Sequence, residues 1–256
     1  MAVPATMDDG TQIHFVSEGK GEPVVLIHGF LMDAEANWIK PGVVKSLAQK
    51  HQAIALDLRG HGKSEKPHET ERYGEEMVKD VVRLMDHLEI QRAHIVGYSF
   101  GAAVAMKMLV TEPERFRSVT IAGGSGYTEY SDSSWLETQS GNRDEGMSVS
   151  ESLMATLNHP PERKPALERV LGRHDARVIA AITKTRQSLT VTEEQLMSNE
   201  VPTLVIYGSQ EERSAREAIE KLDGVISNAR FQTIDGANHL TAFRMPEFSK
   251  VLKEYL

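Results

Sequence analysis

Six short runs of apolar residues recur along the chain, and five of them end in glycine. They span residues 23–29, 52–60, 93–99, 118–124, 202–208 and 230–236. A continuous apolar run of this length, closed by a turn residue, is typical of a β-strand that is buried on both faces. Two earlier stretches, residues 3–7 and 12–16, flank the turn Asp8-Asp9-Gly10 and predict an antiparallel hairpin. The chain must therefore fold around a central sheet.

Between these runs, apolar residues recur at the three- and four-residue spacing of amphipathic helices. The stripes are Met77, Val81, Leu84, Met85 and Leu88, then Ala215, Ala218, Ile219 and Leu222, then Phe248, Val251, Leu252 and Tyr255. Strands that alternate with helices need crossover connections, so the fold class is α/β with a mostly parallel sheet. The alternation stops between residues 125 and 199, where polar, Gly/Ser-rich sequence leads into helical patterns. This segment is predicted to be a helical insertion.

Composition excludes several classes of function. The net charge of −8, with no cluster of Lys and Arg, argues against a nucleic-acid partner. No apolar run approaches the roughly 20 residues of a membrane helix, and the first ten residues lack the pattern of a signal peptide. The absence of cysteine excludes disulfides, thiolate metal sites and a cysteine nucleophile. We expect a cytoplasmic protein with no membrane insertion.

Residues 97–101 read Gly-Tyr-Ser-Phe-Gly and lie between a predicted strand and an alanine-rich stretch. In the pattern G-x-S-x-G the serine occupies a tight strand-to-helix turn. The glycines let strand and helix approach closely, and the turn holds the hydroxyl of Ser99 out of the fold. The N-terminus of the following helix favours negative charge that develops beside it. The pattern predicts that Ser99 is a nucleophile rather than an ordinary helix cap.

The chain resembles the α/β-hydrolase fold superfamily over its whole length apart from the insertion. The resemblance rests on four blocks in a fixed order, at residues 28–30 (HGF), 57–64 (DLRGHGKS), 97–101 (GYSFG) and 236–239 (GANH). It implies an α/β-hydrolase core made of residues 1–124 and 200–256. Residues 125–199 then correspond to the helical lid or cap of that family. The serine argues against the branches of the family that use an aspartate nucleophile.

A serine hydroxyl needs a base to take its proton, and the resemblance assigns that role to His239. It places the acid that orients the histidine three residues after Gly208, where this chain has Glu211 instead of the usual aspartate. The adjacent Glu212 is an alternative acid, and Glu129 is a less well placed one. His28 and His61 border turns and His94 lies on a predicted strand, so these three are expected to be structural.

The oxyanion of an acyl-transfer reaction needs preorganised donors. The resemblance assigns these to the backbone N–H groups of Phe30 and Phe100. Trp38, Trp135 and Phe243 are candidates for an acyl pocket, although aromatic residues are more often core. The segment Gly62-Lys63-Ser64 lacks the first glycine of a phosphate-binding loop, and no metal-ligand spacing occurs. We expect neither a metal nor a cofactor.

The leading hypothesis is a serine hydrolase that acts on a small ester or related acyl substrate through an acyl-enzyme. A second hypothesis is a non-catalytic small-molecule binder or sensor on the same fold. A third keeps the Ser-His-acid triad but passes the acyl group to another acceptor, as an acyltransferase or perhydrolase. The size of the acyl group and the oligomeric state remain open at this point.

Overall fold

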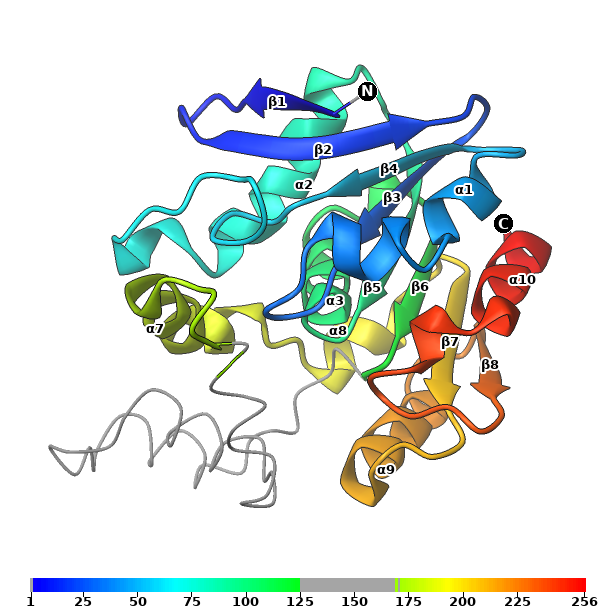
Figure 1. Cartoon of the computed structure of the whole chain (residues 1–256). Helices are drawn as coiled ribbons and strands as arrows, with labels where there is room; N and C mark the ends of the chain where they lie inside the picture. The colour runs from blue at the N-terminus through cyan, green and yellow to red at the C-terminus, as the bar shows by residue number, and fades with distance from the viewer. Residues whose placement is uncertain (1, 125–168, 170) are drawn as a thin grey trace, which may run out of the picture.

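The structure is a computed structural model that describes residues 2–124, 169 and 171–256. An eight-stranded sheet runs through the molecule in the order β1-β2-β4-β3-β5-β6-β7-β8 (Figure 1). The strands are β1 (Ala2–Thr6), β2 (Gln12–Glu18), β3 (Pro23–Ile27), β4 (Gln52–Leu56), β5 (Ala93–Tyr98), β6 (Phe116–Ala122), β7 (Thr203–Gly208) and β8 (Ala229–Ile234). Strands β1, β2 and β4 pair antiparallel, and all other pairs are parallel. The α/β class with a mostly parallel sheet is confirmed.

Helices flank the sheet on both faces (Figure 1). Among the described residues, the α-helices are α1 (Val43–Leu47), α2 (Glu75–His87), α3 (Phe100–Thr111), α7 (Ala176–Thr185), α8 (Glu193–Met197), α9 (Arg213–Glu220) and α10 (Pro246–Tyr255). Short 3-10 or π turns are η1 (Glu35–Ile39), η2 (Thr70–Arg72), η3 (Pro113–Arg115), η5 (Arg186–Leu189), η6 (Lys221–Gly224) and η7 (Ala242–Arg244). The three predicted stripes lie in α2, in α9 with η6, and in α10.

Strand β3 shows why the apolar runs are continuous. Val25 and Ile27 join one core cluster with residues of α2 and α3, whereas Val24 and Leu26 join another with residues of α1 and α10. Successive side chains point to opposite faces, and helices cover both. All four side chains are buried, and full burial of such a side chain contributes about 1.5–3 kcal/mol.

The observed strands differ from the predicted runs at their ends, and strands β2 and β6 show why. The hairpin forms with Thr6 opposite Gln12, but β2 continues to Glu18 because it also pairs with β4. Strand β6 begins at Phe116 and ends at Ala122, two residues earlier than predicted at each end. It ends there because Gly123 has a φ of 59°, which lies outside the extended region.

The described part of the insertion is helical, as predicted. Helix α7 begins after Asp175, whose side chain accepts a hydrogen bond from the backbone of Arg177. It buries an apolar face that includes Val178 and Ile182 in the same core cluster as α2 and α3. Residues 125–168 lie outside the described residues, and the division of the chain into core and lid stays a prediction.

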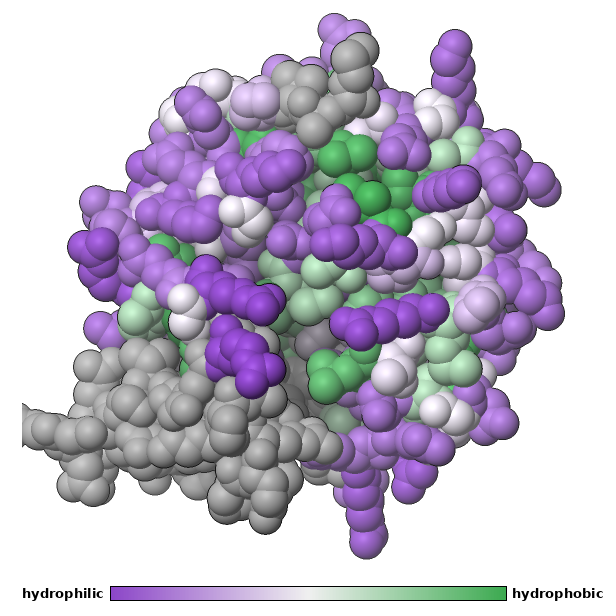
Figure 2. All heavy atoms as spheres, viewed as in Figure 1, coloured by the Kyte–Doolittle hydropathy of each residue, from purple (hydrophilic) through white to green (hydrophobic). Residues whose placement is uncertain are grey.

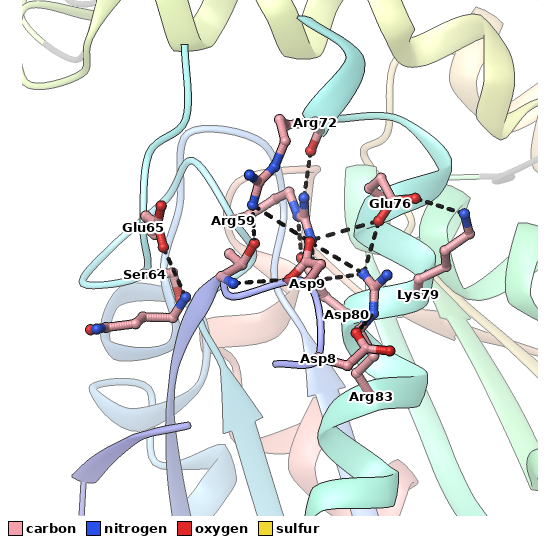
Figure 3. Close-up of polar contacts among 12 residues, drawn as sticks. Asp8, Asp9, Arg59, Ser64, Glu65, Arg72, Glu76, Lys79, Asp80 and Arg83 are labelled. Carbon is pink, nitrogen blue, oxygen red and sulfur yellow. Dashed lines mark hydrogen bonds and ion pairs between the residues drawn. The ribbon is translucent and has the colours of Figure 1, made fainter. Parts of the chain in front are cut away.

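A buried arginine joins three segments of the core (Figure 3). The guanidinium of Arg59, in the loop after β4, donates from Nε to Asp80 of α2 at 2.6 Å and from Nη1 to the carbonyl of Arg72 at 2.8 Å. Its Nη2 donates to Asp9 in the hairpin turn at 3.0 Å. Arg59 and Asp80 are both fully buried. The network therefore fastens the hairpin and helix α2 to the loop that follows β4.

The face seen in Figure 2 is mainly hydrophilic, with smaller apolar areas between polar side chains. Among the large apolar side chains of the described residues, Met197 and Leu240 are the most exposed, at 59% and 63%. Within the described part of the chain, no helix combines the length and hydrophobicity needed to cross a bilayer.

Candidate active site

The predicted site residues all follow the carboxyl ends of parallel strands. Phe30 follows β3, Ser99 follows β5, Glu211 follows β7 and His239 follows β8. These ends lie at the same edge of the sheet, which is where α/β folds place their ligands. Residues that are up to 140 positions apart in the chain therefore meet in space.

Ser99 sits in a strained turn between β5 and α3. Its φ of 53° and ψ of −113° are rare for a residue with a side chain. Its backbone N–H donates to the carbonyl of Ala122 at 2.8 Å. A Cβ on Gly97 would lie 2.3 Å from the carbonyl oxygen of Gly101, and one on Gly101 would lie 2.2 Å from that of Ile27. Only glycine fits at either position, so the motif is a steric requirement of this turn.

His239 contacts the serine directly. Its Nε2 lies 3.0 Å from the Oγ of Ser99, within hydrogen-bond distance. The hydroxyl of Tyr98 donates to the backbone carbonyl of His239 at 2.8 Å, and burial raises the pKa of this phenol, so it remains a donor. Tyr98 thus ties the loop of His239 to strand β5. Sequence reasoning missed this role, because a tyrosine in the second place of the motif carries no distinct signal.

Glu211, and not Glu212, faces the histidine. The Oε2 of Glu211 lies 3.7 Å from the Nδ1 of His239, which is ion-pair distance but longer than a good hydrogen bond. Only 1% of its side chain is exposed. Its Oε1 is buried and has no hydrogen-bond partner among the described residues. Glu212 is exposed at the start of α9, and Glu129 lies outside the described residues.

Burial raises the pKa of Glu211 to about 7. The negative charge of Glu212 acts in the same direction, and a backbone hydrogen bond at Gly208 opposes it. Desolvation disfavours the ionised form of a carboxyl group. Near neutral pH, Glu211 therefore exists in both its protonated and its ionised form.

The turn that carries Glu211 packs directly on the segment that leads to His239. A Cβ on Gly208 would lie 2.2 Å from the carbonyl oxygen of Ala237. The backbone N–H of Gln210 donates to that same oxygen at 2.7 Å, and the N–H of Ser209 donates to Ile234 at 2.9 Å. These contacts hold the acid and the histidine in a fixed relation.

The two predicted oxyanion donors belong to segments next to the serine. Phe100 follows Ser99 directly, and a Cβ on Gly29 would lie 3.4 Å from the Cβ of Ser99, so the loop of Phe30 lies against the serine. Neither Phe30 N–H nor Phe100 N–H donates to a described residue. Two donors without partners beside a nucleophile are what an oxyanion requires.

The loop of Phe30 belongs to an apolar cluster of buried and half-buried side chains. Phe30 and Leu31 pack against Leu171 and Ile179 of the insertion. The guanidinium of Arg186, also in the insertion, lies 5.9 Å from the centre of the Phe100 ring. The insertion therefore contacts both segments that carry the predicted oxyanion donors. No pattern in the sequence pointed to Arg186.

The three histidines that were expected to be structural are all buried. His28 is fully buried, accepts from the N–H of Leu58 through Nε2 at 3.0 Å, and has its pKa lowered by burial. The ring of His61 lies 5.0 Å from that of His28 and is equally buried. His94 lies in β5 and contacts the hydroxyl of Ser118 at 2.8 Å.

Of the three aromatic residues proposed for an acyl pocket, the two that the structure describes lie in the core. Trp38 and Phe243 are buried in the core on the α1 and α10 face, and Trp135 lies outside the described residues. Among the residues that the structure describes, no group of three or more His, Asp or Glu side chains is arranged to hold a metal ion.

Comparison with known proteins places the chain in the same fold family that the geometry indicates. The sequence model of the family described as the alpha/beta hydrolase fold matches residues 22–244. The chain is 34% identical over 132 residues to a 2-hydroxymuconate semialdehyde hydrolase of Pseudomonas sp. (strain CF600). This match covers 49% of this chain and 46% of that one. An acetyltransferase component of the acetoin cleaving system of Pseudomonas putida is 36% identical over 117 residues, covering 46% of this chain and 30% of that one. The chain thus spans less than half the length of these curated relatives.

Among solved structures, a hydrolase from Pseudomonas aeruginosa PA01 superimposes with a TM-score of 0.78 at 23% identity, covering 99% of this chain and 97% of that one. A thermophilic esterase from Thermogutta terrifontis superimposes with a TM-score of 0.77 at 22% identity, covering 100% and 97%. At this level of identity the likeness concerns the fold. Because the family match extends from β3 to the segment beyond His239 and thus includes every predicted site residue, the chain belongs to the alpha/beta hydrolase family.

Proposed function

We propose that this protein is a serine hydrolase in which Ser99, His239 and Glu211 act as a catalytic triad. The observation that carries the proposal is the 3.0 Å contact between the Ser99 Oγ and the His239 Nε2, made from a strained turn. A serine held in a costly backbone conformation against a histidine has the geometry of an activated nucleophile. The family supports hydrolase chemistry.

In the proposed reaction, Ser99 Oγ attacks the substrate carbonyl while His239 Nε2 takes the hydroxyl proton. Ionised Glu211 orients the imidazole and stabilises the imidazolium. The N–H groups of Phe30 and Phe100 stabilise the oxyanion. His239 returns the proton to the leaving group as the carbon–oxygen bond breaks, which leaves an acyl-enzyme. Water, deprotonated by His239, then attacks the acyl carbonyl, and the acid and Ser99 are released.

The substrate class that we propose is a small carboxylic ester with an apolar acyl group. The apolar cluster formed by Phe30, Leu31, Leu171 and Ile179, which includes the residue of the predicted oxyanion donor Phe30, favours an apolar acyl chain. Related structures include two esterases and an enol-lactonase, which supports ester or lactone substrates. Relatives named as hydrolases of meta-cleavage products make carbon–carbon bond hydrolysis the second class to test.

The first experiment treats wild type and Ser99→Ala with a fluorophosphonate and records the intact mass of each. A single adduct on wild type that is absent from Ser99→Ala is the expected result, because only an activated serine reacts. The absence of an adduct on folded wild type would contradict the proposal and favour the binder or sensor hypothesis.

The second experiment distinguishes hydrolysis from acyl transfer. A panel of p-nitrophenyl esters from acetate to octanoate is incubated with water alone, with added alcohol, or with hydrogen peroxide. We expect free acid as the main product and a rate that does not rise with either acceptor. A rate that rises in proportion to the alcohol or peroxide would instead identify an acyltransferase or a perhydrolase.

A further inference from the structure

The segment of residues 28–34, here named the oxyanion loop, is not held by secondary structure. It begins after β3 ends at Ile27 and precedes the π turn η1. Leu31 within it has a φ of 59°, a left-handed conformation that disfavours a branched side chain. A loop in a strained conformation persists only when the surrounding structure constrains it. The contacts that constrain it therefore decide where the Phe30 N–H points.

Hydrogen bonds hold residues at both ends of this loop, two through its backbone N–H groups and one through the side chain of His28. They run from the Gly29 N–H to the Asn37 Oδ1 at 3.0 Å, from the Leu58 N–H to the His28 Nε2 at 3.0 Å, and from the Ala34 N–H to the Asp57 Oδ1 at 2.8 Å. Two of them connect the oxyanion loop to the loop after β4.

Asp57 is itself held firmly. Its second oxygen, Oδ2, accepts from the backbone N–H of Lys63 at 2.9 Å and contacts the Nδ1 of His14 in β2 at 2.9 Å. A Cβ on Gly62 would lie 2.3 Å from the Asp57 carboxyl carbon, so the carboxyl packs against that backbone. Asp57 is 3% exposed. The Oδ2 of Asp57 is therefore held by the loop after β4 and by β2, and its Oδ1 accepts the hydrogen bond from the oxyanion loop.

We propose that Asp57 is a positioning residue that sets the place of the oxyanion donor at Phe30. Ala34, which Asp57 holds, lies four residues after Phe30. Phe30 itself lies in a turn that the Met32 N–H closes by donating to the carbonyl of Gly29 at 3.2 Å. A shift of Ala34 is therefore transmitted to the Phe30 N–H. This inference rests on the proposed function, because it assigns a role within the same site.

The test is Asp57→Asn. An amide cannot accept on both of its polar atoms, so either Ala34 or Lys63 loses its acceptor. Active sites are first counted by titration to completion with the fluorophosphonate, so that kcat refers only to competent molecules. We expect kcat per titrated site to fall about 10- to 100-fold, which is less than the loss of an oxyanion donor itself. KM should change little, because the defect concerns the transition state.

A second readout separates positioning from a merely structural role. A trifluoromethyl ketone with the acyl chain of the best ester forms a tetrahedral adduct whose oxyanion occupies the same donors. Its inhibition constant should rise by the same factor as kcat/KM falls, because transition-state analogues follow transition-state stabilisation. A loss of folded protein alone would lower the titrated fraction and leave the inhibition constant unchanged.

Asp9→Asn is the matched control. It makes the same chemical change in the Arg59 network, which holds the other side of the loop after β4 (Figure 3) and has no contact with the oxyanion loop. Its kcat per titrated site should stay near that of wild type. Asn37→Ala removes the acceptor of the Gly29 N–H, and we expect it to reproduce the kinetic pattern of Asp57→Asn. It also carries the test if Asp57→Asn does not fold.

Three outcomes would overturn the inference. The first is a kcat per titrated site of Asp57→Asn that equals that of wild type. The second, if Asp57→Asn does not fold, is an unchanged kcat per titrated site in Asn37→Ala. The third is a fall in kcat per titrated site in Asp9→Asn that is as large as the fall in Asp57→Asn. Each of these presupposes that wild type forms the Ser99 adduct and turns over esters. Failure of the proposed function would instead appear as a wild type that forms no adduct, so the two failures are distinguishable.

Discussion

Glu211 is one methylene longer than the aspartate that the family resemblance led us to expect at this position. The structure accommodates the extra length by burying the carboxyl against the loop of His239, at 3.7 Å between Oε2 and Nδ1. This burial raises the pKa of the Glu211 carboxyl group to about 7. An acid of this kind orients the histidine only when it is ionised.

At the residue scale, the first prediction concerns which glutamate acts. Glu211→Gln should lower kcat by about 10²- to 10⁴-fold, because a neutral amide does not stabilise the imidazolium of His239. Glu212→Gln, the matched change at an exposed neighbour, should leave kcat within about twofold of wild type. Steady-state kinetics with the p-nitrophenyl ester that wild type hydrolyses fastest measures kcat for both variants. An equal fall in kcat in both would contradict the assignment of Glu211 as the acid.

The second prediction concerns pH. Because the pKa of Glu211 is about 7 in the folded protein and near 4.5 when unperturbed, the folded state binds an extra proton between these values. The contribution of Glu211 to the free energy of unfolding should therefore fall as pH rises from about 4.5 to 7. Over the upper part of this range kcat/KM should rise, because the orienting carboxylate forms.

Urea unfolding of wild type and Glu211→Gln at several pH values, together with pH–rate profiles, tests this prediction. The difference in unfolding free energy between the two proteins should change in the direction of a less stable wild type as pH rises. A difference that does not depend on pH would show that Glu211 ionises like an exposed glutamate.

The third prediction concerns the strain at Ser99, whose φ is 53°. Ser99→Gly and Ser99→Ala both remove the nucleophile, but only glycine adopts this conformation without steric cost. A left-handed residue with a Cβ costs about 1–2 kcal/mol, and the greater chain entropy of glycine offsets part of this. We expect Ser99→Gly to unfold with about 1 kcal/mol more free energy than Ser99→Ala. Equal stability would mean that the turn is unstrained.

At the element scale, the site depends on how closely β5 and α3 approach the end of β3. Gly101 at the start of α3 lies so near β3 that a Cβ would meet the carbonyl oxygen of Ile27 at 2.2 Å. Backbone atoms cannot rotate away as a side chain can. The elbow therefore couples the position of Ser99 to the beginning of the oxyanion loop.

The fourth prediction follows from this contact. Gly101→Ala should lower the free energy of unfolding by about 1–3 kcal/mol or more, because it overpacks a rigid junction, and it should also lower activity per folded molecule. Gly224→Ala in η6, where a Cβ would meet nothing within 4 Å, should change stability by less than about 1 kcal/mol. Urea unfolding compares the two, and a similar effect at both sites would contradict the steric argument.

At the scale of the whole molecule, the Arg59 network holds together segments from the hairpin turn, the loop after β4 and helix α2. Asp80→Ala leaves the fully buried Arg59 guanidinium without its main partner. Removal of one member of a buried ion pair costs about 3–5 kcal/mol. We therefore predict a large loss of unfolding free energy.

The control is Glu217→Ala, which removes an exposed ion pair with Arg213 on α9. Exposed pairs of this kind contribute about 0–1 kcal/mol, so this variant should be close to wild type in urea unfolding. If Asp80→Ala lowered the free energy of unfolding no more than Glu217→Ala does, the Arg59 network would not be important for holding these segments together.

Local patterns in the sequence determined the strands and the elbow around Ser99, whereas His239 was predicted from the family resemblance. The apolar runs predict buried strands because both faces of each strand need apolar side chains, and this requirement acts over a few neighbouring residues. Gly97 and Gly101 indicate the elbow for a similar reason, because a Cβ at either position would clash with nearby backbone atoms. Strand ends were less certain because a single positive φ, as at Gly123, moves them.

Only the tertiary structure decided which side chains from distant segments meet. Glu211 and Glu212 are adjacent in sequence, yet one is buried against His239 and the other is exposed. The contacts of Tyr98 with the His239 loop and of Asp57 with the Ala34 backbone span 141 and 23 residues. Such pairings depend on distances in space between side chains, and no periodicity or spacing along the chain encodes those distances.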